Sequence, residues 1–491
     1  MPIGTRSSFL KEMQMIHTTD EFIDAQSHDY IRLSDRIWGL AELGYVEFES
    51  SDAHIEYLER AGFEITRGVG GIPTAFIAEA GTSGPIIGIL GEFDALSGLS
   101  QESQALECRL STEIANGNGH GCGHHLLGTS AHLAAAAVKD YLAKEKLPGI
   151  VRFYGCPAEE CGGGKTFMAR AGLFDDLDAA LTWHPGWMNG VKTFNFLAAK
   201  QAFFRFTGVA AHAGTSPHLG RSALDAVELM NIGTNFLREH MLPDARVHYA
   251  ITDSGGTAPN VVQAHAEVMY MVRGPRNRDV AELFERVEAI AQGAALMTGC
   301  KVEQRFDVAF SNVLQNGPLN ELMHKHLVRL GTPAYDDRDL AFADAMQKTA
   351  RQEEVDAIGR MLTDVWRNPK PLFDTISRLD TEHLIDVHGS TDVGDVSWIT
   401  PTVQCMTACF AFGTTPHSWQ WVAQGKSSIA HKGMVLAAKT IAATAIDLFR
   451  DPSLIEAAKQ DLVMRRAGEP YVNPIPDDVQ PPLQGREPAK R

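Results

Sequence analysis

Residues 149–160 read GIVRFYGCPAEE, which is a short apolar run, a turn marked by glycine and proline, and a pair of carboxylates. The same order of apolar run, marked turn and polar side chains recurs along the chain. It predicts strands at residues 85–91, 149–155, 179–183 and 405–413. Short strands that lead through such turns into helices build parallel α/β sheets. The chain is therefore predicted to have an α/β fold.

The turns after these strands carry the side chains best suited to chemistry. These side chains are Asp94, Glu159, Glu160, His184 and His417. In open α/β sheets ligands bind beyond the carboxyl ends of the strands, so we expect the turns to meet along one edge. Residues 126–144 are Ala-rich with apolar side chains at helical spacing, which predicts a helix with residues 120–125 at its N-terminus.

A different pattern begins near residue 200 and ends near residue 306. Strands are predicted at residues 202–207, 247–252 and 266–272, and helices at residues 223–240 and 280–297. The order strand, helix, strand, strand, helix is typical of a compact α+β domain of the ferredoxin-like sort. We therefore predict that a second domain is inserted into the first.

The predicted division has a catalytic domain at residues 20–198 and 313–465, an inserted domain at 199–312, and a Pro-rich irregular tail at 466–491. Residues 336–388 are polar and helix-prone, and we expect them to form an insertion on the catalytic domain. A chain of 491 residues exceeds what one hydrophobic core usually supports, which agrees with two domains.

The composition excludes several classes of protein. With 44% hydrophobic and 21% charged residues, the chain is globular rather than disordered. Its 44 lysines and arginines against 61 acidic residues give a net charge of −17, so neither nucleic acid nor an anionic membrane is expected as a partner. The seven cysteines are scattered, and no apolar stretch of about 18 residues occurs. These features predict a cytoplasmic protein.

Residues 119–125, GHGCGHH, place a thiol and an imidazole two residues apart. The surrounding glycines let the backbone bring Cys122 and His124 to one point. Thiolate and imidazole suit zinc, and also nickel, cobalt or manganese. The alternative is a buried cysteine beside a histidine that starts a helix, and this segment alone leaves both possibilities open.

Glu159 and Glu160 are adjacent carboxylates directly after an apolar strand and a proline. One of them could bind a metal while the other removes a proton from water, as metal-assisted hydrolysis requires. A solvated acidic helix start is the ordinary alternative for such a pair. Their coincidence with Cys122, His124 and His184 along one predicted edge favours the metal site.

Histidines supply the remaining candidate ligands. His184 lies between an apolar strand and a proline, with no helix in which to be a passive core residue, which favours a ligand. For the last ligand the candidates are His417, predicted to follow a strand, and His431, predicted to lie at a helix start, where a capping or surface histidine is common. We favour His417.

Three candidates lie in the inserted domain. His212, in AAHAGTSPH, lies between a strand and a helix, where a mobile or partner-supplied imidazole could stabilise an oxyanion. Asn260 and Arg273 could hold a substrate carboxylate, and the guanidinium is suited to a bidentate grip. Each of the three would be an ordinary surface residue if taken alone.

Seven segments taken together resemble the aminoacylase and carboxypeptidase-like metallopeptidase superfamily, in its amidohydrolase branch. The resemblance covers residues 20–462. It implies a zinc-peptidase-like catalytic domain with an inserted domain that serves as a lid and as the dimerisation surface. The segments are GEFDALSGLSQ, NGHGCGHHLLGTSAH, RFYGCPAEE, ALTWHP, AAHAGTSPHLGRSALDAVELM, STDVGDVSW and TTPHSWQWVAQGKSSIAHKGM.

The resemblance also implies a role for each matching position. Glu159 would be the general base, His212 would act from the lid of a partner subunit, and Asp94 would orient a ligand from behind the metal. The implied cofactor is one or two divalent ions, manganese or zinc, and the implied assembly is a homodimer or a heterodimer with a homologous subunit. The implied metal ligands are Cys122, His124, Glu160, His184 and His417.

The implied reaction is hydrolysis of the amide bond of a small N-acyl amino acid, with an aromatic acyl group as in aminobenzoyl-glutamate. Glu92 stands where many relatives have a ligating histidine, and His125 where near relatives have Asn or Asp, so metal number and substrate preference stay open. The alternatives are an aryl-amine deaminase or an indolyl-amino-acid hydrolase on the same metal, a thiol hydrolase using Cys122 with His124, and a regulatory subunit of a two-chain hydrolase.

Overall fold

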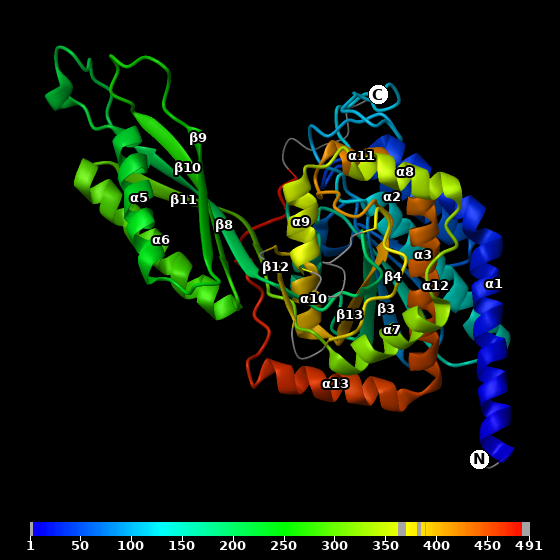
Figure 1. Ribbon diagram of the computed structural model, residues 1–491. Helices are drawn as coiled ribbons and strands as arrows, with labels where there is room; N and C mark the ends of the chain where they lie inside the picture. The colour runs from blue at the N-terminus through cyan, green and yellow to red at the C-terminus, as the bar shows by residue number, and fades with distance from the viewer. Residues whose placement is uncertain (1–2, 362–369, 381–383, 388, 484–491) are drawn as a thin grey trace.

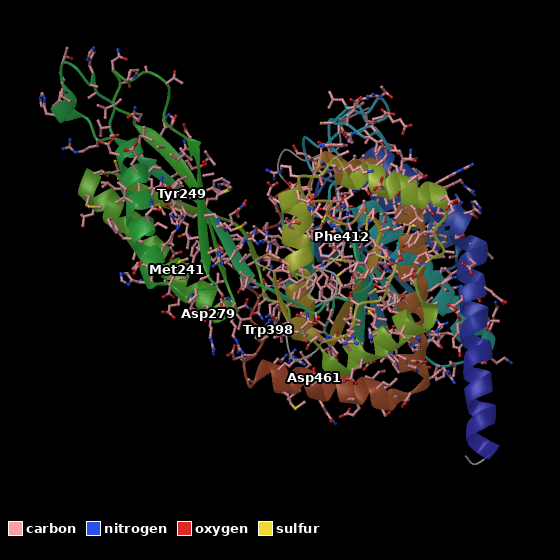
Figure 2. The ribbon with its side chains drawn as sticks, viewed as in Figure 1. Met241, Tyr249, Asp279, Trp398, Phe412 and Asp461 are labelled. Atoms are coloured by element: carbon pink, nitrogen blue, oxygen red, sulfur yellow. The ribbon has the colours of Figure 1, made fainter. Side chains whose placement is uncertain are left out.

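The computed structural model describes residues 3–361, 370–380, 384–387 and 389–483. A large body is built on a seven-stranded sheet, and a smaller unit built on a four-stranded sheet stands off from it (Figure 1). Trp398 lies where the two meet (Figure 2), and its indole N–H donates to the carbonyl of Asn312 at 2.9 Å. None of the described helices is long and apolar enough to span a membrane.

The large sheet has the strand order β1-β2-β4-β3-β5-β13-β6. The four central strands β4, β3, β5 and β13 are parallel, and β2 and β6 pair antiparallel at the two ends of this block. The predicted strands are therefore neighbours, and the prediction that their carboxyl ends share an edge is confirmed. The strands are β1 (Glu64–Arg67), β2 (Phe76–Gly81), β3 (Ile86–Glu92), β4 (Ile150–Cys156), β5 (Ala179–Gly186), β6 (Gly190–Val191) and β13 (Thr402–Ala408).

Alternate residues of the central strands enter two different cores. Ile89 and Leu181 pack with residues of α3 and α12, whereas Leu90 and Ala180 pack with residues of α4 and α10. Both faces of the sheet are thus covered, which explains why these strands are almost continuously apolar. The helices of the body are α1 (Ile3–Leu40), α2 (Phe48–Arg60), α3 (His124–Glu145), α4 (Gly164–Arg170), α7 (Gly317–Leu330), α8 (Asp337–Gln347), α9 (Gln352–Met361), α10 (Val393–Ile399), α11 (Trp419–Gln424), α12 (Ser428–Arg450) and α13 (Pro452–Arg466), with the short 3-10 turn η1 (Val69–Gly71).

The start of α3 shows why this part of the chain needs glycine. The helix begins at His124, as predicted, and Gly123 before it has a φ of 83°, a left-handed conformation that glycine adopts without steric cost. A Cβ atom on Gly123 would lie 2.8 Å from Cγ of Pro185. Glycine therefore lets the turn that carries Cys122 approach β5, which carries His184.

The smaller unit is an antiparallel sheet of order β11-β8-β10-β9 with α5 and α6 packed on it around a core of their own. The predicted strands and helices of this unit are confirmed, and so is the α/β fold with an inserted α+β unit. The fourth strand, β11, was not predicted. The elements are β8 (Ala198–Thr207), η2 (Pro217–Leu219), α5 (Ala223–Leu237), η3 (Arg238–His240), β9 (Arg246–Asp253), β10 (His265–Gly274), α6 (Asn277–Thr298) and β11 (Lys301–Phe310).

Two local predictions need correction. The strand predicted at residues 405–413 ends at Ala408, because the backbone then leaves the ladder and the amides of Ala411 and Phe412 donate to Gln424 and to the Pro371 carbonyl. His417 therefore lies in a loop and does not directly follow the strand. His184 lies within β5 rather than in the turn after it.

The remaining predictions concern the C-terminal half. Residues 467–483 contain no helix or strand, as predicted for the Pro-rich tail, and residues 484–491 lie outside the described part. The segment 336–388 forms α8 and α9, while residues 362–369, 381–383 and 388 lie outside the described part. Within the same segment, β12 (Ile385–Val387) pairs in parallel with β7 (Phe194–Phe196).

Candidate metal centre

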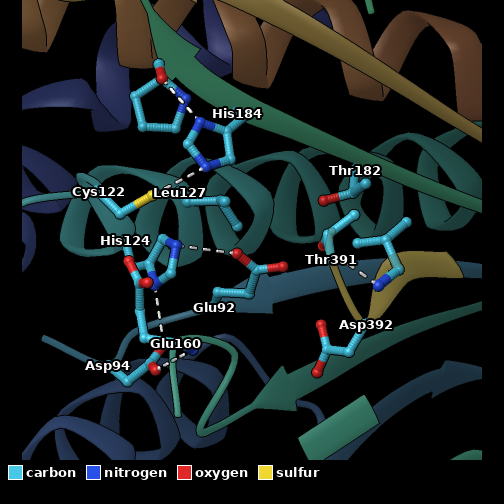
Figure 3. A network of polar contacts seen from close by, with 12 residues as sticks. Glu92, Asp94, Cys122, His124, Leu127, Glu160, Thr182, His184, Thr391 and Asp392 are labelled. Carbon is cyan, nitrogen blue, oxygen red and sulfur yellow. Dashed lines mark hydrogen bonds and ion pairs between the residues drawn. The ribbon is translucent and has the colours of Figure 1, made fainter. Parts of the chain in front are cut away.

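The predicted ligands come together at the carboxyl edge of the parallel strands. Figure 3 shows Cys122, His124, Glu160 and His184 there. Three groups of three residues each offer one potential ligand atom per residue, and within a group these atoms all lie within 4.8 Å of one another. The first two groups share Cys122, and the first and third share His124. The groups are Cys122 with His124 and His184, Cys122 with Glu160 and His417, and Glu92 with His124 and Glu159.

Loops hold the ligands that do not come from α3 or β5. Glu159 and Glu160 follow Ala158, whose φ of 59° is unusual for a residue with a side chain, and the amide of Ala158 donates to Oε1 of the buried Glu47 at 2.8 Å. His417 also has a positive φ, of 58°, and its amide donates to the carbonyl of Gly121 at 2.9 Å. Such strained positions are concentrated at functional sites.

Hydrogen bonds through Nδ1 fix the rings of two histidines, as is usual for histidines that bind a metal. Nδ1 of His124 lies 2.8 Å from Oδ1 of Asp94, and Nδ1 of His184 lies 2.8 Å from the carbonyl of Pro185. When Nδ1 donates these bonds, Nε2 keeps its lone pair for a metal. Nε2 of His184 points at Sγ of Cys122, 3.3 Å away. Asp94 therefore lies behind His124, where the resemblance placed it.

Two buried atoms test whether the site suits a cation. Nε2 of His124 and Oε1 of Glu160 make no hydrogen bond among the described residues, and their polar neighbours are other potential ligands, Oε2 of Glu92 at 3.2 Å and Nε2 of His417 at 3.3 Å. Buried polar atoms are nearly always hydrogen-bonded, so each such atom needs an explanation. A thiol, imidazoles and a carboxylate that converge on one point form a donor set for a divalent metal such as zinc or manganese. The residues present therefore fit a divalent cation.

Electrostatics distinguish the surroundings of Glu159 from those of Asp94. Burial raises the pKa of Glu159 well above its ordinary value, and the nearby carboxylates of Glu92 and Glu160 raise it further. Burial also acts to raise the pKa of Asp94, but His124 and the Glu160 amide outweigh it and lower that pKa. Asp94 thus stays ionised, whereas Glu159 is suited to accept and release a proton.

A buried ionic network behind the ligands was missed by sequence reasoning. Nζ of Lys165 lies 2.7 Å from Oε1 of Glu92 and also pairs with Asp392, and all three side chains are buried. The other oxygen of Glu92 lies 3.2 Å from Nε2 of His124. Glu92 was noted only as a departure from the pattern of relatives. Lys165 and Asp392 lie 227 residues apart, so no local pattern could pair them.

None of the candidates from the smaller unit belongs to the groups of potential metal ligands. His212 is exposed in the loop beyond β8. This loop lies at the end of the unit away from the large body (Figure 1). Its Nδ1 accepts the amides of Gly214 and Thr215 at 3.1 and 3.2 Å, which leaves the proton of the neutral ring on Nε2. The backbone carbonyl of Asn260 accepts the amide of Ala213 nearby, at 2.9 Å. Arg273 lies at the opposite end of the sheet, where Nη1 donates to Oγ of Ser390 at 3.2 Å.

The two other histidines considered from the sequence have partners elsewhere. His125 is buried, with Nε2 3.0 Å from the carbonyl of Gly425. His431 lies near the start of α12, as predicted, with Nε2 2.9 Å from Oδ1 of Asp35. Neither belongs to the groups of potential ligands.

Comparisons with known proteins identify the family of this chain. Residues 88–365 match peptidase family M20/M25/M40. The chain is 49% identical over 474 residues to one of the subunits of p-aminobenzoyl-glutamate hydrolase from Escherichia coli, covering 94% of this chain and 98% of that protein. The other subunit of the same hydrolase is 30% identical over 240 residues, covering 46% of this chain and 53% of that protein. A dinuclear metal-binding peptidase of the M20 family from Bacillus subtilis shares the fold, with a TM-score of 0.57 and 18% identity over 87% of this chain and 99% of that one.

The family match spans more than half of the chain, and the hydrolase subunit that is 49% identical is covered almost from end to end. The predicted resemblance is therefore confirmed, and the enzyme class follows from it. The protein is a metal-dependent amidohydrolase whose cofactor is divalent metal, and it belongs to peptidase family M20/M25/M40.

Proposed function

We propose that this enzyme hydrolyses the amide bond of N-acyl amino acids, with aminobenzoyl-glutamate-like compounds as its preferred substrates. The observation that carries the proposal is that all five predicted metal ligands belong to two groups that share Cys122, while the carboxylate of Glu159 lies in a third group that shares His124. The 49% identity to part of a p-aminobenzoyl-glutamate hydrolase supports the substrate class. The family match favours hydrolysis over the deaminase considered as an alternative.

The metal ligands in this proposal are the five predicted residues, with Asp94 and the Pro185 carbonyl fixing the imidazoles of His124 and His184. Manganese or zinc, as one or two ions, would supply Lewis-acid polarisation of the scissile carbonyl. Glu159 removes a proton from the attacking water and returns it to the departing amine. The ligands are Cys122, His124, Glu160, His184 and His417.

Residues of the smaller unit act on the substrate from two protomers. The Nε2–H of His212 from a partner subunit donates to the oxygen that becomes negative in the tetrahedral intermediate. Asn260 of the same partner and Arg273 of the chain that holds the metal bind a carboxylate of the amino acid. A second protomer is required for His212 and Asn260, because the loop beyond β8 lies at the end of the smaller unit away from the large body (Figure 1), whereas Arg273 contacts Ser390 of its own large body.

Association through the smaller unit is supported by its exposed apolar side chains. β9 is an edge strand on which Tyr249 and Ile251 are exposed, and Phe236 and Leu296 are exposed on the helices. Exposed apolar groups beside an open strand edge are typical of interaction surfaces. The partner is a second copy of this chain or a homologous protein, as the two-subunit hydrolase of Escherichia coli suggests.

A cytoplasmic location is part of the proposal, because all seven cysteines are free thiols.

A thiol mechanism is disfavoured by the surroundings of Cys122. Burial raises the pKa of its thiol, and the nearby carboxylate of Glu160 raises it further. Reactive cysteines instead lie where the thiolate is favoured. The thiolate at this position therefore needs a bound cation.

The test is release of free amino acid from aminobenzoyl, benzoyl, indolyl and aliphatic N-acyl amino acids by the purified chain, with metal content measured on the same sample. We expect hydrolysis that a chelator abolishes and metal restores. A Glu159→Gln variant should keep its metal and lose activity by about 100-fold or more. Ammonia release without amino acid would identify a deaminase, and chelator-resistant turnover would identify a thiol hydrolase. Activity only after a homologous protein is added would indicate a regulatory role.

A further inference from the structure

The loop that carries the paired glutamates begins at a residue with an unusual backbone. Ala158 comes two residues after Cys156, where β4 ends, and it is fully buried with a φ of 59°. Left-handed backbone crowds the Cβ atom of an L-residue and therefore costs free energy. Such a conformation persists only where its surroundings hold it. The contacts of Ala158 therefore decide where the next residue, Glu159, points.

The carboxylate of Glu47 holds the amide of Ala158. Its Oε1 accepts that amide at 2.8 Å, and its Oε2 accepts the hydroxyl of Thr74 at 3.0 Å. Glu47 is 0% exposed and lies at the start of α2, 111 residues before Ala158 in the sequence. Because both of its oxygens are engaged, the buried carboxylate is fixed in direction and presents one acceptor to one amide.

The chain just before α2 packs on the same loop. The phenol of the buried Tyr45 donates to the carbonyl of Gly162 at 2.8 Å. A Cβ atom on Gly44 would overlap Sγ of Cys161, so the two segments are in close contact. The loop is therefore held on both sides of the paired glutamates, at Ala158 and at Gly162.

Glu159 lies between two anchored amides. Glu47 holds the amide of the residue before it, Ala158, and Oδ2 of Asp94 accepts the amide of the residue after it, Glu160, at 2.9 Å. In the part of the chain that the structure describes, no hydrogen bond holds the carboxylate of Glu159 itself. The direction of this side chain is therefore set by the backbone on either side of it.

We infer that Glu47 is a positioning residue for the general base. By accepting the amide of Ala158, it stabilises the left-handed backbone that aims Glu159 at the metal centre. The inference rests on the proposed role of Glu159, and Glu47 belongs to none of the groups of potential metal ligands. Glu47 acts as a hydrogen-bond acceptor, so the reach of its oxygen matters and its charge does not.

Two variants of Glu47 separate reach from charge, with release of glutamate from aminobenzoyl-glutamate as the assay. Glu47→Asp keeps the charge but draws the acceptor back by one methylene. It should lower kcat by about 10-fold or more and change KM less, because a displaced base fails in the transition state rather than in substrate binding. Glu47→Gln loses the charge, but its amide oxygen still accepts the Ala158 amide while its NH₂ group donates to Thr74. It should keep kcat close to that of the wild type.

A change at Ala158 tests whether Glu47 acts through this backbone. Glycine adopts left-handed backbone without the cost that alanine has. Ala158→Gly should therefore restore kcat to the Glu47→Asp variant by about 3-fold or more. The gain should be smaller in the wild-type background, where Glu47 already holds the conformation, and this difference measures the coupling between the two residues.

A matched control and a metal assay separate positioning from general damage. Glu56→Asp shortens an exposed carboxylate of the same helix, α2, and should leave kcat and KM at wild-type values. Metal content should be equal in all of these proteins.

Four results would overturn the inference and leave the proposed function intact. They are wild-type kcat in Glu47→Asp, an equal loss in Glu47→Gln, a loss that Ala158→Gly does not reduce, and loss of metal from Glu47→Asp. If Glu47→Asp does not fold alone, the double variant with Ala158→Gly must fold and turn over, or the inference fails. A wild-type enzyme that releases no amino acid, or a Glu159→Gln variant as active as the wild type, would instead contradict the proposed function.

Discussion

The carboxylate of Asp94 joins the two sides of the metal centre, because its Oδ1 lies 2.8 Å from Nδ1 of His124 while its Oδ2 accepts the amide of Glu160 at 2.9 Å. The ring of His124 and the loop that carries Glu160 are thus positioned by the same buried group. Since α3 and the loop after β4 are distant in sequence, this link sets the spacing of the two ligands.

Replacing Asp94 should therefore weaken metal binding more than it changes the fold. In Asp94→Asn the side chain keeps its shape but loses the charge that orients His124, and we expect metal affinity to fall by about 10-fold to 100-fold. Competition against a chromophoric chelator measures this. Asp52→Asn, at an exposed carboxylate that pairs with Arg67, is the control and should bind metal as the wild type does. Equal affinity in the two variants would contradict the role given to Asp94.

Removing Lys165 should destabilise the protein. Lys165→Met leaves the buried carboxylates of Glu92 and Asp392 without their cation, and such a loss costs about 3–5 kcal/mol in the free energy of unfolding. Urea unfolding measures the change. The control is Lys348→Met, which breaks an exposed ion pair with Asp344 and should cost under about 1 kcal/mol. Similar losses in both variants would show that the buried network does not stabilise the fold.

The loop that carries the paired glutamates depends on a close backbone contact. A Cβ atom on Gly164 would lie 1.9 Å from the carbonyl oxygen of Pro157, so Gly164→Ala must displace the segment between them. We expect this variant to lose metal affinity and activity. Gly293→Ala is the matched control, because a Cβ there meets nothing within 4 Å, and alanine in helix α6 should stabilise by about 0.5–1 kcal/mol. A fully active Gly164→Ala enzyme would refute this constraint.

Stability should fall in mild acid through buried histidines. Burial lowers the pKa of His54 from 6.5 to about 3 in the folded protein. Between these two pKa values only the unfolded chain binds the proton. The contribution of neutral His54 to the free energy of unfolding is therefore complete above pH 6.5. It is lost as the pH falls below that value, by up to about 1.4 kcal/mol per pH unit. His54→Leu removes this site and should flatten the dependence of unfolding free energy on pH between 7 and 5. Measurements in chelator exclude effects of metal binding, and an unchanged slope would contradict the assignment.

The sequence was informative where local patterns determine structure. The central strands were found because a sheet covered on both faces needs unbroken apolar runs, and α3 because its apolar residues recur at helical spacing. β11 was missed because half of KVEQRFDVAF is polar and most of its first half is exposed. The strand before His417 was predicted too long, because the apolar segment continues beyond Ala408 into buried loop.

The site was predictable to the extent that its residues stand in recognisable local patterns. Cys122, His124 and Glu160 lie in short segments with suggestive spacing, and the structure brings them to one place. Lys165 and Asp392 gave no such signal, because a lysine in a helix or an aspartate before one is ordinary until the fold surrounds it. Their environment arises from contacts between distant segments.

Five side chains of this chain are proposed to hold divalent metal. Anomalous diffraction from crystals of active enzyme loaded with manganese or zinc is the sharpest test of this ligand set. We expect peaks at bonding distance, about 2.0–2.3 Å, from Sγ of Cys122 and from the imidazoles and carboxylate of the other ligands. Active, metal-loaded crystals whose anomalous peaks all lie away from Cys122, His124, Glu160, His184 and His417 would contradict it.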